Sequence, residues 1–298
     1  MINIKESAKL LIVAAKEWWA KDPFRESAVI AYYAIFSMPG LLVVIITIAG
    51  YFFGADAVNN RLASQISSTL GEDTAKQVQE MVKIASESKN SIWATIIGVI
   101  TILFGATGVF AQFQKSLNII WSVKADETKS GILRLIRVRL FSFGLIVAIA
   151  FIMMVSLVVT SLLSVMGDWL TSYFSESLLV VIQVLNFIIS VVIMAFLFAI
   201  MFKFFPDAKI RWNHVWLGSI VTALLFLLGM NGLSLYFGKA EPGSGYGAAG
   251  SIILILLWVS YSSMIVFYGA EYTHAYAIQK DGYIPPDKNA VKQHGRKV

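Results

Sequence analysis

The sequence predicts an all-α membrane protein, a polytopic bundle of six transmembrane helices. Three observations predict this fold class. Of the 298 residues, 57% are hydrophobic and only 14% are charged, with a mean hydropathy of +0.72, which is too apolar for a soluble domain. Six long stretches lack Asp, Glu, Lys and Arg. Finally, basic residues are concentrated in alternate connections between those stretches.

The segment before the first stretch is expected to be an amphipathic helix that lies on the inner membrane surface. Charged and apolar residues interleave from residue 4 to residue 19, which is the pattern of an interfacial helix. Asp22-Pro23 is expected to end it, because proline disfavours helical geometry in the residue before it. A solvated tail is the alternative that the pattern leaves open.

The six uncharged stretches span residues 27–55, 90–114, 140–167, 177–202, 212–238 and 242–270. A bilayer core requires about 20 apolar residues of helix, so each stretch is long enough to cross. Because a backbone in hydrocarbon must satisfy its own hydrogen bonds, we expect all six to be helical. The second and sixth helices are expected to continue to about Trp121 and Ala277.

The distribution of Lys and Arg predicts the orientation. The N-terminal segment, the second and fourth connections and the C-terminal tail together hold 18 of these residues, and the other side holds 5. Since basic residues favour the cytoplasmic side, both termini are predicted to be cytoplasmic. The transmembrane domain is expected to cover residues 1–278, followed by a flexible, basic cytoplasmic tail over residues 279–298.

The longest outer connection, residues 56–89, has helical periodicity. Apolar residues recur every four positions from Val58 to Leu70, and a second apolar stripe follows Gly71. This pattern predicts two short outer helices that cap the bundle and are separated near Gly71. Their role is open between an interfacial cover and a gate over an outward-facing cavity.

Proline and charged residues within the helices mark candidate functional positions. Pro39 is expected to kink the first helix, because proline removes a backbone hydrogen bond. Glu271 is predicted to be ionised and held by a cation, with Lys115 at a matching depth as the first choice and Arg211 or Lys203 as alternatives. Interfacial anchoring is the alternative role for each charged group. The candidate polar site consists of Glu271, Lys115, Asn118, Tyr32, Asp207 and Arg211.

The residues offer little for catalysis. The chain has no Cys and three His, and no metal-ligand motif joins the His residues. Glu271 and His274 have the spacing of half a di-iron motif, but the second half and two further carboxylates are missing. No phosphate-binding loop for ATP and no convincing pair of nucleophile and base are present. We therefore predict no enzyme, no metal and no cofactor.

Small residues cluster in two of the stretches. FGATGVFAQ at residues 104–112 and YGAAGSI at residues 246–252 are expected to let helix backbones pack closely.

Four parts of the chain together resemble the YihY family of bacterial inner-membrane proteins, also called the virulence factor BrkB family. They are AYYAIFSMP at residues 31–39, GATGVFAQFQKSLNIIW at 105–121, FPDAKIRW at 205–212, and YGAAGSIILILLWVSYS with GAEYTHAYA within 246–277. The resemblance covers residues from about 20 to 280. It implies a multi-pass protein of the bacterial inner membrane associated with envelope integrity and serum resistance, for which transport of lipids or lipopolysaccharide precursors has been proposed.

The functional hypotheses follow from the polar groups and the resemblance together. A carrier or lipid translocase is the leading hypothesis, with membrane lipids and their anionic head groups as partners, because the basic inner face suits an anionic group. A membrane scaffold that organises envelope proteins without transport is the alternative. The family was long labelled ribonuclease BN. A membrane-embedded hydrolase or nuclease is not supported, since no metal cluster or nucleic-acid platform can be assembled, and nucleic acid is not expected as a partner.

Overall fold

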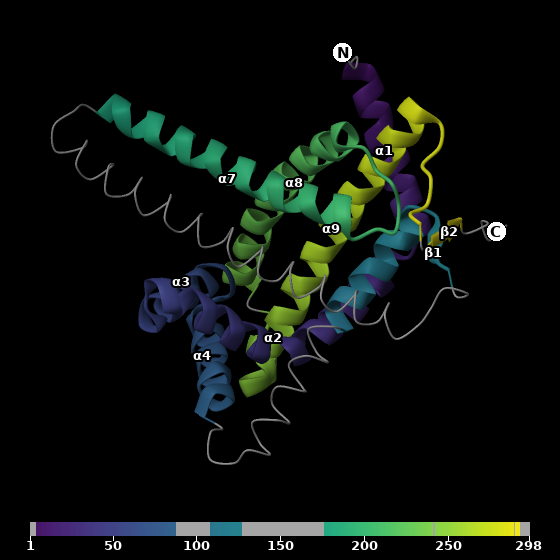
Figure 1. Ribbon diagram of the computed structural model, residues 1–298. Coiled ribbons are helices and arrows are strands. Elements are labelled where there is room, and N and C mark those ends of the chain that lie inside the picture. The colour runs from purple at the N-terminus through teal and green to yellow at the C-terminus, as the bar shows by residue number, and fades with distance from the viewer. Residues whose placement is uncertain (1–3, 88–107, 127–175, 241, 289, 293–298) are drawn as a thin grey trace.

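The computed structural model describes residues 4–87, 108–126, 176–240, 242–288 and 290–292, and most of them are helical (Figure 1). The predicted stretch 140–167 and the part of the second stretch before residue 108 lie outside the described residues. Within the described residues, three helical segments are long and apolar enough to cross a membrane, namely Phe187–Phe204, Trp212–Ala240 and Gly250–Asp281. The prediction of a helical membrane protein is confirmed at this level.

The N-terminal part forms two helices, α1 (Ile4–Ala20) and α2 (Pro23–Phe53). The break between them falls at Asp22, whose φ of 53° is left-handed, and Pro23 starts α2. The predicted helix end at Asp22-Pro23 is confirmed. Helix α2 continues through Pro39 as one helix, so the kink there stays a prediction.

Helix α1 packs along α9 (Gly250–Asp281), which lies at the centre of the bundle (Figure 1). The Trp18 indole Nε1 donates to the Met264 carbonyl oxygen at 3.1 Å, and the Tyr268 hydroxyl donates to the Leu11 carbonyl oxygen at 3.1 Å. Buried Leu10 of α1 and Tyr272 of α9 lie in one apolar cluster. The amphipathic helix therefore packs its apolar face, at least in part, on protein.

The predicted cap is present as two helices, α3 (Ala55–Leu70) and α4 (Glu72–Glu87). Gly71 separates them with a φ of 90°, a conformation that glycine adopts without a steric penalty. Leu70 and Val78 pack with Phe237 of α8 (Trp212–Ala240) and Ile255 of α9. The cap thus covers the end of α8 and α9 where α8 finishes and α9 begins.

The sixth predicted helix begins later and ends later than expected. A 3₁₀ helix, η2 (Ser244–Ala249), precedes α9, which starts at Gly250 and continues to Asp281. The predicted start at residue 242 is therefore wrong. The backbones of Gly243 and Gly250 meet there so closely that a side chain on either would clash. The small residues of YGAAGSI thus serve a tight turn as well as the helix.

The contact between α8 and α9 has a reciprocal pattern that the sequence analysis missed. Gly218 and Thr222 of α8 face Thr273 and Gly269 of α9, so that each threonine lies over the glycine of the other helix. A methyl group on either glycine would overlap the facing threonine hydroxyl. Small residues of this kind let two membrane helices approach closely.

An apolar core fills the end of the bundle opposite the cap. Phe202 of α7 (Glu176–Phe204), Leu117 of a helix over residues 108–120, and Val215 of α8 are fully buried in it. Two short strands close this end, with β1 (Val123–Ala125) antiparallel to β2 (Ala290–Lys292) and Lys124 opposite Val291. Residues 290–292, within the part expected to be a flexible tail, thus pair with β1 as a strand, and the flexibility of the tail stays a prediction.

Candidate functional site

The loop between α7 and α8 meets the segment that follows α9. Pro206 stands just after the end of α7, and proline cannot continue the hydrogen-bonding pattern of a helix. Gly282 ends α9 with a φ of 69°, which turns the chain back toward this loop. The Lys209 amide donates to the Pro285 carbonyl oxygen, and the Asp287 amide donates to the Asp207 carbonyl oxygen, both at 2.9 Å.

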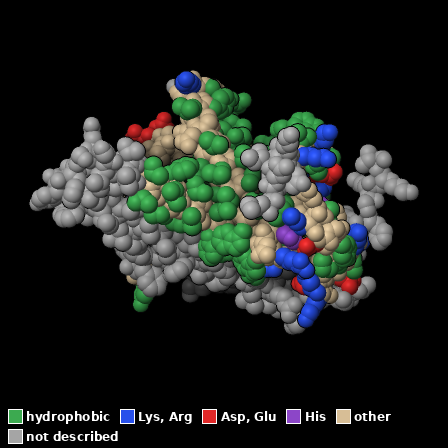
Figure 2. Space-filling model, turned by 90° about the horizontal axis from the view of Figure 1, so that it is seen from above, with side chains coloured by type: hydrophobic (Ala, Val, Ile, Leu, Met, Phe, Trp, Pro, Cys, Tyr) green, Lys and Arg blue, Asp and Glu red, His purple; other side chains and the backbone are tan. Residues whose placement is uncertain are grey.

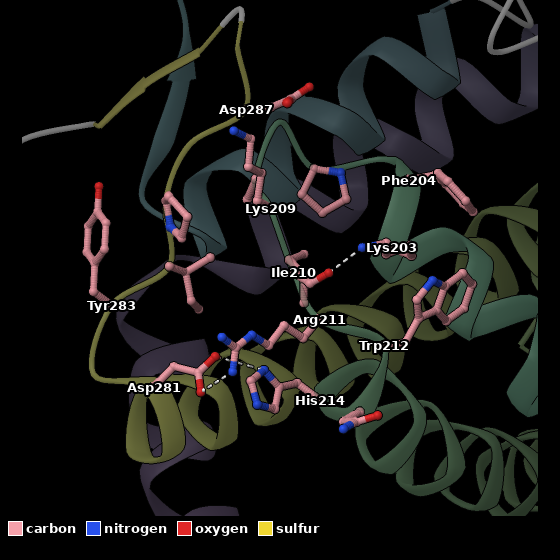
Figure 3. A pocket seen from close by; sticks show the side chains of 15 residues that line it. Lys203, Phe204, Lys209, Ile210, Arg211, Trp212, His214, Asp281, Tyr283 and Asp287 are labelled. Carbon is pink, nitrogen blue, oxygen red and sulfur yellow. Dashed lines mark hydrogen bonds and ion pairs between the residues drawn. The ribbon is translucent and has the colours of Figure 1, made fainter.

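A pocket of about 990 Å³ lies between these segments and the first turn of α8 (Figure 3). This volume suits a small molecule or a lipid head group. The residues that line it are Lys203, Phe204, Pro206, Ala208, Lys209, Ile210, Arg211, Trp212, Asn213, His214, Asp281, Tyr283, Ile284, Pro285 and Asp287.

Three cations line the pocket, and two of them have partners. Arg211 forms an ion pair with Asp281 at 3.3 Å, and Figure 3 shows His214 approaching the same carboxylate, with Nδ1 3.8 Å from Oδ2. Lys203 donates to the Ile210 carbonyl oxygen and lies 5.8 Å from the centre of the Trp212 ring. Lys209 is exposed and has no ion pair within the described parts of the chain.

The start of α8 adds a partial positive charge to the pocket. Trp212, Asn213 and His214 form its first turn and line the pocket. The amides of His214 and Val215 both donate to the Arg211 carbonyl oxygen. The amides of the first helical residues before them have no partner within the helix, so they attract an anion. Figure 2 shows Lys, Arg, Asp and Glu side chains gathered beside a histidine on the face viewed from above.

Asp207 fixes the loop that lines the pocket. Asn118 donates from Nδ2 to one carboxylate oxygen at 2.8 Å and accepts the Asp207 amide at 2.8 Å, and Gln114 donates to the other oxygen at 3.2 Å. The helix over residues 108–120 therefore holds the loop in place. Two of the candidate residues, Asn118 and Asp207, are thus in direct contact.

Glu271 is held by a cation, as predicted, but the cation is not Lys115. Lys21, at the break between α1 and α2, lies 2.6 Å from Glu271 Oε1, and the Glu271 side chain is 1% exposed. Lys115 is exposed and has no ion pair among the residues that the structure describes. The matching depth of Lys115 and Glu271 stays a prediction, and the two residues lie in different surroundings, one exposed and one buried.

The remaining candidates are dispersed. Tyr32 is 60% exposed on α2, in ring contact with Tyr33 and Phe36. Arg211 lies in the pocket and pairs with Asp281, not with Glu271. The predicted six-residue site therefore divides into the Asn118–Asp207 contact, the pocket with Arg211, and the Lys21–Glu271 pair. In the described ranges, no group of three or more acidic, His or Cys residues is placed to bind a metal.

The sequence analysis missed Lys21, His214 and Asp281. Lys21 was counted only as one of several basic residues before the first span, although its place beside a predicted helix break indicated a fixed position. His214 and Asp281 come from opposite ends of two helices, α8 and α9, that run antiparallel. The sequence could have indicated the contact of His214 with Asp281 only if the packing of α8 against α9 had been predicted.

The fold and the pocket together define a helical membrane protein with a polar site at one end of its apolar helices. Comparison with known families then identifies the group. The family model described as "Virulence factor BrkB" matches residues 14–294, so the chain belongs to this family.

The relatives found carry the name UPF0761 membrane protein. One from Pseudoalteromonas atlantica is 25% identical over 250 residues, covering 82% of this chain and 78% of the relative. One from Saccharophagus degradans is 25% identical over 270 residues, covering 88% of this chain but 58% of the relative. One from Vibrio atlanticus is 28% identical over 257 residues, covering 84% and 77%. The chain thus spans little more than half the length of some relatives. No solved structure matches.

Proposed function

We propose that this protein is a lipid carrier of the bacterial inner membrane and that the pocket holds the phosphate-bearing head group of a lipid. The observation that carries the proposal is the presence of Lys203, Lys209 and Arg211 in one cavity of about 990 Å³, next to the first turn of α8. Phosphate groups bind guanidinium and ammonium groups and the free amides of a helix start.

The position of the pocket supports a lipid as the ligand. It lies where the apolar helix α7 ends and the apolar helix α8 begins, with Phe204 and Trp212 in its wall. Aromatic residues of this kind favour the boundary between lipid and water. A head group there would have its acyl chains directed along the apolar helices.

The pocket is built from the connection between α7 and α8 and the segment after α9, which belong to the set of segments that holds 18 of the Lys and Arg residues. This excess supports a cytoplasmic location for the pocket and for both termini. The cap of α3 and α4, at the other end of α8 and α9, would then face outward. No phosphate-binding loop for ATP was found in the sequence, so the driving force would come from an ion gradient, a partner or the lipid gradient itself.

Binding is tested with the full chain in nanodiscs that contain phosphatidylglycerol, with bound lipid counted by native mass spectrometry. Lys209→Ala and Arg211→Ala should each lower the affinity about fivefold, because one basic residue near a membrane surface contributes about 1 kcal/mol. Lys239→Ala, at the other end of α8, is the matched control. Equal binding by all three variants and the unchanged chain would refute the head-group site.

Movement is tested separately in vesicles with a fluorescent phospholipid and a membrane-impermeant quencher. A carrier should expose the inner-leaflet label faster than protein-free vesicles do, and Arg211→Ala should slow this step. Head-group binding without any acceleration would contradict the carrier and favour the alternative, a non-transporting scaffold.

A further inference from the structure

Three titratable groups meet at a second place, separate from the pocket. Glu271 of α9 has Lys21 at 2.6 Å on one oxygen and His274 Nδ1 at 3.8 Å on the other. The side chain of Glu271 is 1% exposed, that of His274 is 19% exposed and that of Lys21 is 21% exposed. A buried carboxylate that touches two basic groups is costly to maintain, which marks it as a functional candidate.

Three buried atoms in this cluster lack hydrogen bonds within the described residues. Neither carboxylate oxygen of Glu271 accepts one, although Oε1 contacts Lys21 as an ion pair, and Trp121 Nε1 donates none. The Trp121 ring stands edge to face with the His274 ring, with 5.2 Å between their centres. The cluster is therefore not a saturated structural network, because it has room for one more donated hydrogen bond at Glu271.

Among the described residues, Lys21 and His274 are the basic groups within 4.0 Å of the Glu271 carboxylate. Helix α8 presents the uncharged Gly218 and Thr222 to this part of α9. Its histidine, His214, instead contacts Tyr276 and Asp281. On the side of α2, the carboxylate of Glu26 is occupied by Ser116 at 2.7 Å and Gln112 at 3.1 Å, and by Arg25. The helix over residues 108–120 contributes a backbone carbonyl, that of Ile120, which accepts from Lys21. Lys21, Glu271 and His274 are thus the titratable groups in direct contact in this cluster.

We propose that Lys21, Glu271 and His274 form a proton-binding site that couples protonation to the position of α1. A metal ion does not suit the site, because the Lys21 ammonium already neutralises the carboxylate and would repel a second cation. A proton does suit it. The imidazole of His274 takes up one proton, becomes an imidazolium with an N–H on each ring nitrogen, and donates from Nδ1 to the free Oε2 of Glu271. The net charge of the three groups then changes from zero to +1.

His274 is the entry point for the proton. Its side chain is partly exposed, whereas the Glu271 side chain is buried behind it. Histidine is also the side chain whose ordinary charge change falls near neutral pH. Once charged, the imidazolium competes with Lys21 for the same carboxylate, so the hold of Lys21 on α9 weakens.

Lys21 connects this exchange to the N-terminal helix. It stands in the break before α2, next to the left-handed Asp22, and also donates to the Ile120 carbonyl oxygen at 3.3 Å. Weakening its ion pair frees the break to move between α9 and the helix over residues 108–120. A proton-binding site of this kind would supply the proposed lipid carrier with a coupling ion. The proton site does not depend on the pocket, because lipid binding to the pocket is measured at one fixed pH and the movement of α1 is measured as the pH changes.

The absence of Cys in the chain allows a direct test by spin labelling of the full chain in nanodiscs. Ile12→Cys on α1 and Ile278→Cys on α9 are both exposed, so labels there leave the packing intact. The distance between the labels is expected to change by at least about 2 Å between pH 8 and pH 5.5, which is the scale of helix shifts. Labels at Leu228 and Leu257, both exposed on α8 and α9, should show no change.

The variant H274Q should abolish the pH response of the α1–α9 pair, and H294Q, in the tail, should leave it intact. H274Q keeps the ion pair of Lys21 with Glu271, so loss of folding is not expected. E271Q is a second test variant. In folded E271Q protein, the pH-dependent change in the α1–α9 distance should also be lost. An unchanged distance in the unsubstituted background, or a response in H274Q equal to that background, would overturn the proposal.

Discussion

Two Lys–Glu ion pairs in this protein have nearly the same geometry and opposite surroundings. Lys21 and Glu271 lie 2.6 Å apart with the carboxylate side chain 1% exposed, whereas Lys76 and Glu72 on α4 lie 2.8 Å apart with both side chains more than half exposed. Water screens the second pair and offers either group another partner. Water barely reaches the carboxylate of the first pair, so the comparison separates the effect of burial from that of contact distance.

The largest expected effect comes from removing one cation from each pair. Lys21→Met leaves the Glu271 carboxylate buried without its partner, which should cost about 3–5 kcal/mol of stability. Lys76→Met should change the stability far less, since both groups are in water. Thermal unfolding in one detergent, followed by intrinsic fluorescence, measures both. If the two variants melt alike, burial does not govern the strength of the pair.

A change in packing where α8 meets α9 tests their close contact without removing a charge. Gly269→Ala would place a methyl group against Thr222 and separate α8 from α9, at an expected cost of about 1–3 kcal/mol. Gly232→Ala on α8, where no atom lies near enough to clash, is the matched control and should not destabilise the protein. Equal melting temperatures for these two alanine variants would contradict the close contact of the two helices.

Asp207 provides an intermediate case, a half-buried carboxylate held by neutral groups. Asn118→Ala removes two hydrogen bonds from it and should cost about 1–3 kcal/mol, less than the loss of Lys21. The same variant should weaken lipid binding, because Asp207 holds the pocket loop. Isothermal denaturation and native mass spectrometry measure the two effects. Full stability together with full binding would show that this contact does not position the loop.

The smallest expected effect concerns the exposed pair. The Lys76 ammonium lowers the pKa of Glu72, chiefly through a hydrogen bond and then through its charge. A lowered pKa means that the pair supports α4 above the ordinary carboxyl range and loses this support as the pH falls. Lys76→Met should return the pKa of Glu72 toward 4.5, as read by NMR titration of its carboxyl carbon. High salt should have a similar effect on the unsubstituted chain.

The sequence predicted helices well where a single pattern, such as a long uncharged stretch or a regular apolar period, determines them. Long uncharged stretches predicted both ends of α7 and α8 to within two residues and those of α2 to within four, and a four-residue period with Gly71 predicted the cap. The start of α9 was wrong, because the turn at Gly243 and Gly250 depends on a backbone contact between residues that a hydropathy pattern does not reveal. The strand at residues 290–292 was not predicted, because its partner, residues 123–125, lies far away in the sequence.

The site was less predictable, because side-chain partners depend on helix rotation and neighbour order. The burial of a charge at Glu271 indicated a cation nearby, and the structure places one there. Depth along the helices favoured Lys115, but depth does not specify which way a side chain points. Lys21 enters from a helix break, where the chain direction changes at Asp22.

A double-mutant cycle tests the central claim, that Lys21 is the residue that holds Glu271. Lys21→Met, Glu271→Gln and the double variant are compared by their free energies of unfolding, next to the same cycle with Lys115→Met. The predicted coupling energy is about 2–3 kcal/mol for Lys21 and below about 0.5 kcal/mol for Lys115, because only residues in contact are coupled. A coupling to Lys115 as large as that to Lys21, or none to Lys21, would contradict the assignment.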